Sequence, residues 1–292
     1  MSTKLKGYFL FVCLFALATL QAQLKGKVVD SLSGAPLPWV SIWALHEAVG
    51  TTTEADGTYE IPTRMADKKW VFSSVGYAKK TVVLKPNNTV RLSKQAEELT
   101  EVVIVPMRHS KQEEIGNERG IHQAFDNGPK MDIKFFPYLT EYKKTHYVNR
   151  ISLLTDSKID SATVKIHLYA ADQNGHPGKE LNPQELILMV KKGVFKNRLT
   201  VSDFAIAFPE TGLFVAVEKM MVRSNQWVRE RFDPNSNQNV TLVEYHPFVL
   251  YNRVDKERSW LFVGGEWQAK LPKEGDSLRS FYEPEITVYL TN

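Results

Sequence analysis

Two acidic residues, Glu54 and Asp56, stand at alternate positions just before Gly57 in the hydroxyl-rich stretch GTTTEADGTYEIP. A calcium-binding loop begins with such a pattern and closes with a bidentate glutamate. In this chain the closing position holds Thr63, and Thr52 takes a further ligand position. The ligand count therefore favours a hairpin tip, with Asp56-Gly57 as its turn, over a cation site.

The histidines show no arrangement in the sequence that would support catalysis or metal binding. They are His46, His109, His122, His146, His167, His176 and His246. No two have the spacing of a zinc motif, and none adjoins a serine or cysteine in a nucleophile motif. We therefore expect surface and turn histidines, no metal and no cofactor. His167 lies on the polar face of its strand, where we expect it to be solvated.

Neighbouring carboxylates are the remaining candidates for acid–base chemistry. The pairs are Glu97-Glu98, Glu113-Glu114 and Glu283/Glu285. Glycoside hydrolysis needs two carboxylates about 5 to 9 Å apart across a cleft, which neighbours in sequence do not supply. A protein without enzymatic activity is the favoured interpretation, and a hydrolase with carboxylates on loops is an alternative.

Three tryptophans, Trp227, Trp260 and Trp267, offer a different kind of site, because exposed indole rings can stack on sugars. The competing interpretation is that they fill the core, as large aromatic side chains usually do. Gly264-Gly265 predicts a hairpin that places Trp260 and Trp267 on one sheet. Glycan binding is therefore an alternative function.

The apolar strand TEVVIV offers a possible contact with a partner protein. Its residues Val102, Val103 and Ile104 could pair with the sheet edge of that partner. The favoured alternative is an internal strand of the first domain.

The N-terminus predicts export. Residues 1–22 combine a short basic region, the apolar run YFLFVCLFALATL and Ala22, which is the layout of a cleaved secretory signal. The apolar run is too short to span a bilayer comfortably. The only cysteine, Cys13, lies inside it, so the cleaved chain would have neither a disulfide nor a thiolate. An exported chain without disulfides fits a bacterial envelope protein better than a eukaryotic secreted protein. We expect this chain in the periplasm or associated with the outer membrane.

The charge balance excludes some partners. The formal net charge is only +4, and the lysine pairs are scattered along the chain. Neither observation indicates the basic surface patch that binding to nucleic acid or to an anionic membrane requires. We expect contact with a membrane only by association.

Residues 23–105 show short strands at regular spacing, without a sustained helical period. In WVSIWAL, Val40 and Ile42 point to one face, whereas Ser41 and Trp43 point to the other. Seven or so strands in about 80 residues predict a small antiparallel β-sandwich.

Four motifs in this domain occur in order: GKVVDSLSGAPLPWVSI, GTTTEADGTYEI, VFSSVGYAKKTVVL and LTEVVIV. Together they resemble the carboxypeptidase-regulatory-like domain, a transthyretin-like sandwich. It precedes the plug of many TonB-dependent receptors and occurs in envelope proteins of Bacteroidetes-type bacteria. The resemblance implies an accessory or interaction module without catalysis. The remaining chain is too short for a receptor barrel.

Residues 106–129 are polar and glycine-punctuated, which predicts a linker or an extended strand crossing between domains. Residues 130–292 return to strands and predict a second antiparallel sandwich, jelly-roll-like. In SATVKIHLYAA, alternate residues from Ala162 to Leu168 form an apolar face. LFVAVEKM is apolar on both faces at its start, which predicts a central strand. The stretch VKIHLYAADQNGHPGKEL, followed by GLFVAVE, also resembles the C-terminal part of proteins that carry the same first domain.

The sequence therefore predicts an all-β, two-sandwich protein of the cell envelope. Its expected role is that of a non-catalytic interaction or structural module, with an envelope or outer-membrane protein as partner.

Overall fold

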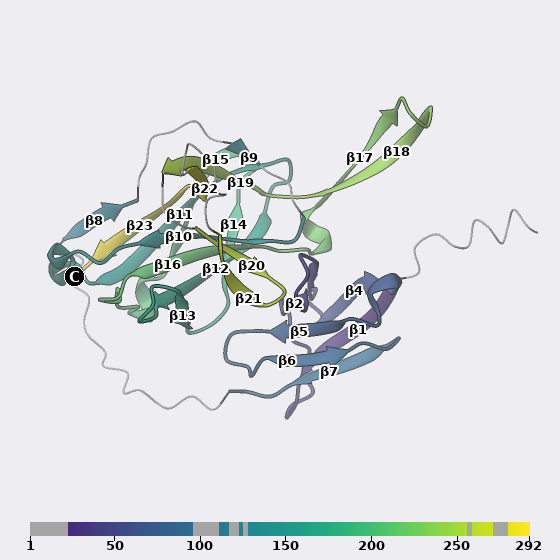
Figure 1. The fold of residues 1–292 in the computed structure, drawn as a ribbon, viewed down its shortest axis with the longest axis horizontal. Coiled ribbons are helices and arrows are strands. Elements are labelled where there is room, and N and C mark those ends of the chain that lie inside the picture. Colours follow the sequence, from purple (N-terminus) through teal and green to yellow (C-terminus); the bar gives the residue numbers. More distant parts are fainter. Residues whose placement is uncertain (1–22, 96–110, 117–122, 125–127, 256–258, 271–279) are drawn as a thin grey trace, which may run out of the picture.

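The computed structural model describes residues 23–95, 111–116, 123–124, 128–255, 259–270 and 280–292. Nearly all of its regular structure is strand, and the described helices are short 3-10 turns. These are η1 (Thr63–Met65), η2 (Thr140–Lys144), η3 (Ser202–Phe204) and η4 (Arg223–Asn225). The strands form two β-sandwiches that lie side by side (Figure 1).

The first sandwich has one sheet of three strands and one of four. The first sheet has the order β4 (Thr58–Pro62), β1 (Gln23–Asp30), β7 (Asn88–Leu92), and the second has the order β3 (Gly50–Thr52), β2 (Ser41–Ala44), β5 (Lys69–Ser73), β6 (Lys80–Val83). The seven strands confirm the predicted sandwich, with one parallel pair, β1 and β7. Val28, Ile42, Trp70 and Phe72 are fully buried between the sheets.

The turn at Asp56-Gly57 connects the two sheets of the first sandwich, because β3 belongs to one sheet and β4 to the other. Gly57 donates to the Glu54 carbonyl oxygen at 2.9 Å, and Glu54 donates to the Thr58 carbonyl oxygen at 2.8 Å. Gly57 has a φ of +77°, as the sequence predicts. The predicted hairpin is nevertheless wrong, because β3 pairs with β2 and β4 pairs with β1. The tight turn closes a corner of the sandwich, where the chain passes from one sheet to the other.

The second sandwich is larger. One sheet contains β10 (Met131–Phe136), β16 (Leu213–Lys219), β12 (Ala162–Ala171), β13 (Pro177–Glu180) and β14 (Leu186–Val190). The other contains β22 (Ser280–Pro284), β19 (Phe248–Asp255), β11 (Tyr147–Ser157), β23 (Ile286–Thr291), β8 (Gln112–Ile115), β15 (Gly193–Thr200) and β9 (Gln123–Ala124). The main apolar core lies between these sheets.

The central strand of the second sandwich follows the sequence prediction. All seven residues of β16 are buried, and the strand lies between β10 and β12. On β12, the alternate apolar residues from Ala162 to Leu168 enter the core. The segment 106–129 contains two short strands, β8 and β9, that pair with β23 and β19 of the second sandwich.

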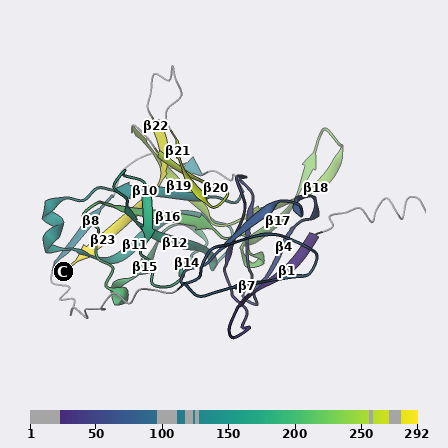
Figure 2. The same cartoon turned by 60° about the horizontal axis from the view of Figure 1, so that its bottom comes forward.

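Two hairpins complete the fold. The hairpin β20 (Ser259–Val263) and β21 (Glu266–Lys270) turns at Gly264-Gly265, as predicted. The second hairpin, which we call the arm, consists of β17 (Gln226–Asp233) and β18 (Gln238–Tyr245). The arm projects beyond both sandwiches in two views (Figures 1 and 2).

Candidate functional site

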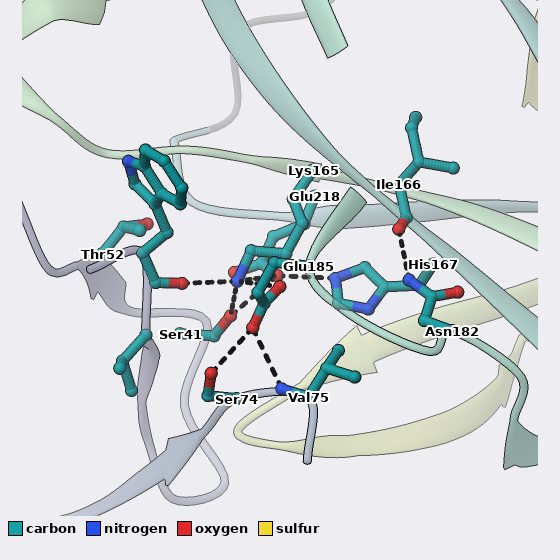
Figure 3. A network of polar contacts seen from close by, with 12 residues as sticks. Ser41, Thr52, Ser74, Val75, Lys165, Ile166, His167, Asn182, Glu185 and Glu218 are labelled. Atoms are coloured by element: carbon teal, nitrogen blue, oxygen red, sulfur yellow. Dashed lines mark hydrogen bonds and ion pairs between the residues drawn. The ribbon is translucent and has the colours of Figure 1, made fainter. Parts of the chain in front are cut away.

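A cluster of charged and hydroxyl side chains lies where the two sandwiches meet. We call it the Lys165 cluster; its members are Ser41, Ser74, Lys165, His167, Glu180, Glu185 and Glu218. Because side chains alternate along β12, Lys165 and His167 point away from the core of their own sandwich and toward the first one. Lys165 is completely buried and His167 is 6% exposed. Figure 3 shows the members of the cluster other than Glu180 at close range.

Lys165 makes the central contacts of the cluster. Its ammonium group donates to the Trp39 carbonyl oxygen at 2.6 Å and to Ser41 Oγ at 2.9 Å, both in the first sandwich. It also forms ion pairs with Glu185 at 3.2 Å and Glu218 at 3.8 Å. A buried cation is tolerated only with such partners, so these contacts tie β12 to the segment that carries β2.

Glu218 is the buried counter-ion on the neighbouring strand. It lies directly opposite Lys165 in the pairing of β12 with β16. It accepts hydrogen bonds from Ser41 Oγ at 2.8 Å and from His167 Nε2 at 2.9 Å. The Ser41 hydroxyl group therefore accepts from Lys165 and donates to Glu218, which joins the two sandwiches by one continuous chain of hydrogen bonds.

The outer carboxylates complete the cluster. Glu180 Oε1 lies 2.6 Å from His167 Nδ1. Glu185 accepts from Ser74 Oγ at 2.9 Å and from the Val75 backbone amide at 3.0 Å. Since both ring nitrogens of His167 face a carboxylate, this arrangement favours the doubly protonated imidazolium.

The electrostatics hold these groups in their charged forms. Burial by itself lowers the pKa of His167, but hydrogen bonds to Glu180 and Glu218 outweigh it and raise the pKa to about 9. Burial raises the pKa of Glu218, but Lys165 and His167 outweigh it and lower the pKa to about 2. Burial likewise lowers the pKa of Lys165, whereas Glu218 and Glu185 raise it above its usual value.

The contact between Ser41 and Lys165 has the composition of a serine–lysine nucleophile pair. That chemistry requires a neutral amine to act as the base and a hydroxyl group open to substrate. Lys165 stays protonated because its pKa is raised, and Ser41 is only 4% exposed. The geometry instead suits a structural role, in which buried ions hold two domains in one fixed arrangement.

Further contacts surround the Lys165 cluster. Thr52 Oγ1 accepts from the Met221 amide at 3.1 Å, and a Glu54 carboxylate oxygen accepts from the Arg223 amide at 2.9 Å. Glu54 thus contributes to the contact between the sandwiches. Asp56, two residues further along the chain, accepts from the Thr58 amide within the turn at 2.9 Å.

The hairpin β20–β21 packs against both sandwiches. The rings of Trp43 in the first sandwich and Phe262 in the hairpin lie 5.2 Å apart in an edge-to-face arrangement. At the turn, a Cβ atom on Gly264 would lie 2.1 Å from the backbone nitrogen of His46. Glycine is therefore needed where the hairpin meets the first sandwich.

The structure brings two of the three candidate tryptophans together. Trp260 and Trp267 lie on the same face of the hairpin β20–β21 and pack, partly buried, on a small apolar cluster that includes Phe214. Trp227 lies on the arm, with its ring 5.8 Å from that of His246. Glycan binding through these three residues stays a prediction. The partner-strand residues Val102, Val103 and Ile104 lie outside the described residues, as does the signal segment 1–22.

The expectation for His167 is wrong. We predicted a solvated side chain because the outward face of an amphipathic strand usually meets water, whereas this face meets the first sandwich. Sequence reasoning also missed Lys165 and Glu218. One usable signal is the glutamate in LFVAVEKM, because a charge within a strand buried on both faces requires a buried counter-ion.

Comparison with known proteins supports the assignment of the first domain. Residues 24–104 match the family model of the CarboxypepD_reg-like domain. The match includes the strands of the first sandwich and supports the resemblance seen in the four motifs. No curated protein matches the chain.

Within the described ranges, no three His, Cys, Asp or Glu side chains are placed to hold a metal ion. None of the helices in the same ranges combines the length and apolar character that a membrane crossing requires.

Proposed function

We propose that this chain is an exported, non-catalytic protein of the cell envelope of a Bacteroidetes-type bacterium. It acts as an interaction or structural module in the periplasm or at the inner face of the outer membrane. Its partner belongs to the outer-membrane transport or assembly machinery, because domains similar to residues 24–104 precede the plug of many TonB-dependent receptors.

One observation carries the non-catalytic part of the proposal. The reactive side chains Ser41, Lys165 and His167 form a buried cluster in which each is bound to a neighbour. Interactions of this kind fix the position of one sandwich against the other and leave these groups without access to a substrate. A rigid pair of domains suits a module that presents surfaces at a set distance.

The first experiment tests export. The full gene is expressed in a Bacteroidetes-type host, and the N-terminus of the protein in each cell fraction is sequenced by mass spectrometry. We expect a chain that begins at Gln23 and is found in the envelope fraction. A chain that retains residues 1–22 in the cytosolic fraction would refute the proposed location.

The second experiment tests the partner. Intact cells are treated with a crosslinker that does not enter the cytosol, and the captured proteins are compared with those of a strain lacking the chain. Crosslinks to one outer-membrane transport or assembly component, mapped to defined residues, are expected. Recovery of only abundant, unspecific envelope proteins would contradict the proposal.

A further inference from the structure

The arm β17–β18 joins the second sandwich through two residues, which we call the root of the arm. Asn225 directly precedes β17, and His246 directly follows β18. Both residues are completely buried, although the sequence predicts that the histidines lie on the surface and in turns. The His246 amide donates to the Asn225 carbonyl oxygen at 2.8 Å, so the two residues also hold each other.

Each side chain of the root attaches the arm to a different part of the second sandwich. Asn225 Oδ1 accepts from the Thr163 amide at 2.9 Å, and Nδ2 donates to the carbonyl oxygens of Thr163 and Met220 at 2.8 and 3.0 Å. His246 Nδ1 accepts from the backbone amide of Lys158, an exposed residue just after β11, at 3.4 Å. A carboxamide does not titrate, whereas the His246 contact exists only while Nδ1 carries no proton.

The other ring nitrogen of His246 has no hydrogen-bond partner. Nε2 is buried, and since Nδ1 is the acceptor, Nε2 carries the proton of the neutral ring. The His246 ring packs against the rings of Trp227, 5.8 Å away, and Phe248, 4.4 Å away. A second proton would therefore place a positive charge among aromatic rings and end the bond from the Lys158 amide.

Charged groups from several strands surround His246. Burial is the main reason that the pKa of His246 lies below its ordinary 6.5. Lys219 on β16 also lowers it, whereas the backbone and carboxylate of Asp156 on β11 and the carboxylate of Glu244 on β18 oppose this effect. Arg229 on β17 pairs with Glu244 at 2.7 Å. The surroundings therefore favour the neutral ring.

We propose that His246 makes the root of the arm an acid-sensitive hinge. In mildly acidic surroundings Nδ1 takes up a proton, the bond from the Lys158 amide is lost, and the ring turns toward water. The β18 end of the arm then leaves the second sandwich, while Asn225 still holds the β17 end. The hinge does not rest on the proposed function, because it depends only on contacts within this chain.

The pH range of the hinge follows from the two states of the root. Because the pKa of His246 is lowered in the closed root, the closed state is fully stable above pH 6.5 and loses stability as the pH falls below 6.5. At pH 5.5 the open state should gain up to about tenfold in population, since its ring titrates near 6.5. His167, with a pKa of about 9, keeps its proton throughout this range.

The first test is amide exchange of the full chain at pH 7.5 and pH 5.5, measured by mass spectrometry and corrected for the direct effect of pH on exchange. Peptides that contain Lys158 and His246 should exchange faster at pH 5.5, by up to about tenfold. His246→Asn keeps an acceptor oxygen near the position of Nδ1 but cannot take up a proton, so its exchange should be equal at both pH values. His146→Asn, which alters an exposed histidine, is the matched control and should follow the wild type.

The second test needs no substitution. The ring signal of His246 and the amide signal of Lys158 are followed by NMR in the full chain from pH 8 to pH 5. Both should change with one midpoint below pH 6.5. The proposal is overturned if His246 titrates while the Lys158 amide signal stays constant, if exchange at the root is the same at both pH values, or if His246→Asn responds to acid as the wild type does.

Discussion

Raising the pH through the pKa of His167 should loosen the contact between the sandwiches. The pKa of His167 is raised from an ordinary 6.5 to about 9 in the folded protein. The stabilisation from this group is therefore fully present below pH 6.5 and is lost as the pH rises through about 9. A difference of this size contributes about 2 to 3 kcal/mol to the free energy of unfolding at pH 7, and almost none of it remains at pH 10.

The other groups around His167 keep their charges over this range. The pKa of Lys165 is raised above its usual 10.5, and that of Glu218 is lowered to about 2. Tyr169, which stacks on His167 with the ring centroids 6.0 Å apart, has a pKa well above 10 because it is buried. Loss of the His167 proton is therefore the main change in this cluster between pH 7 and pH 10.

The assay is urea unfolding at pH 7 and at pH 10, followed by tryptophan fluorescence, for the wild-type chain and for His167→Gln. The wild type should lose about 2 to 3 kcal/mol more than His167→Gln between the two pH values. His146→Gln, which alters an exposed histidine, is the matched control and should follow the wild type. An equal loss in wild type and His167→Gln would refute the assignment of this histidine as the titrating group.

Three substitutions test the other structural arguments. Lys165→Met leaves buried Glu218 with His167 as its remaining cation and takes the ammonium group away from Glu185. It should cost about 3 to 5 kcal/mol in unfolding free energy, measured by urea denaturation. Gly57→Ala brings a Cβ atom to 2.7 Å from the Val28 carbonyl oxygen at a φ of +77°, and should cost about 2 kcal/mol or more. Asn225→Ala removes the buried Asn225 side chain, which bonds to the backbone of Thr163 and to the Met220 carbonyl oxygen at the base of the arm. It should cost about 3 kcal/mol and increase amide exchange in the arm.

Each substitution has a control that isolates its cause. Lys196→Met removes a lysine that is partly exposed and should cost little. Gly34→Ala also forces a positive φ, but nothing lies within 4 Å of the added Cβ atom, so it should cost about half as much as Gly57→Ala. Asn235→Ala alters an exposed residue at the tip of the arm. If each substitution lowers the unfolding free energy by no more than its control does, the roles given to Lys165, Gly57 and Asn225 are contradicted.

The sequence predicts the fold better than it predicts the candidate site. Alternation along β12 places Val164 and Ile166 in the core, and the apolar run of β16 marks a central strand, because both patterns follow from local geometry. The Gly264-Gly265 turn likewise follows from local backbone preferences. The turn at Gly57 is predicted correctly, but the pairing of its flanking strands depends on contacts distant in sequence.

The Lys165 cluster could not be predicted from the spacing of its residues along the sequence. Ser41 and Glu218 are 177 positions apart, and no local pattern states that they meet. Alternation assigns Lys165 and His167 to the outward face of a sheet, but it does not tell whether water or another domain covers that face. The acidic pairs singled out by sequence proximity are not the carboxylates that gather here.

The origin of the charges in the Lys165 cluster bears on how the two domains can be exchanged. Lys165, His167, Glu180, Glu185 and Glu218 all belong to the second sandwich, and the first sandwich supplies only neutral hydroxyl, carbonyl and amide groups around them. Separating the domains would therefore return each ion to water together with its counter-ion. A recombined chain with a different first domain could satisfy the ions of the Lys165 cluster with a few hydroxyl and backbone groups at the same places, so at this cluster an exchange of the first domain during evolution requires no new charge.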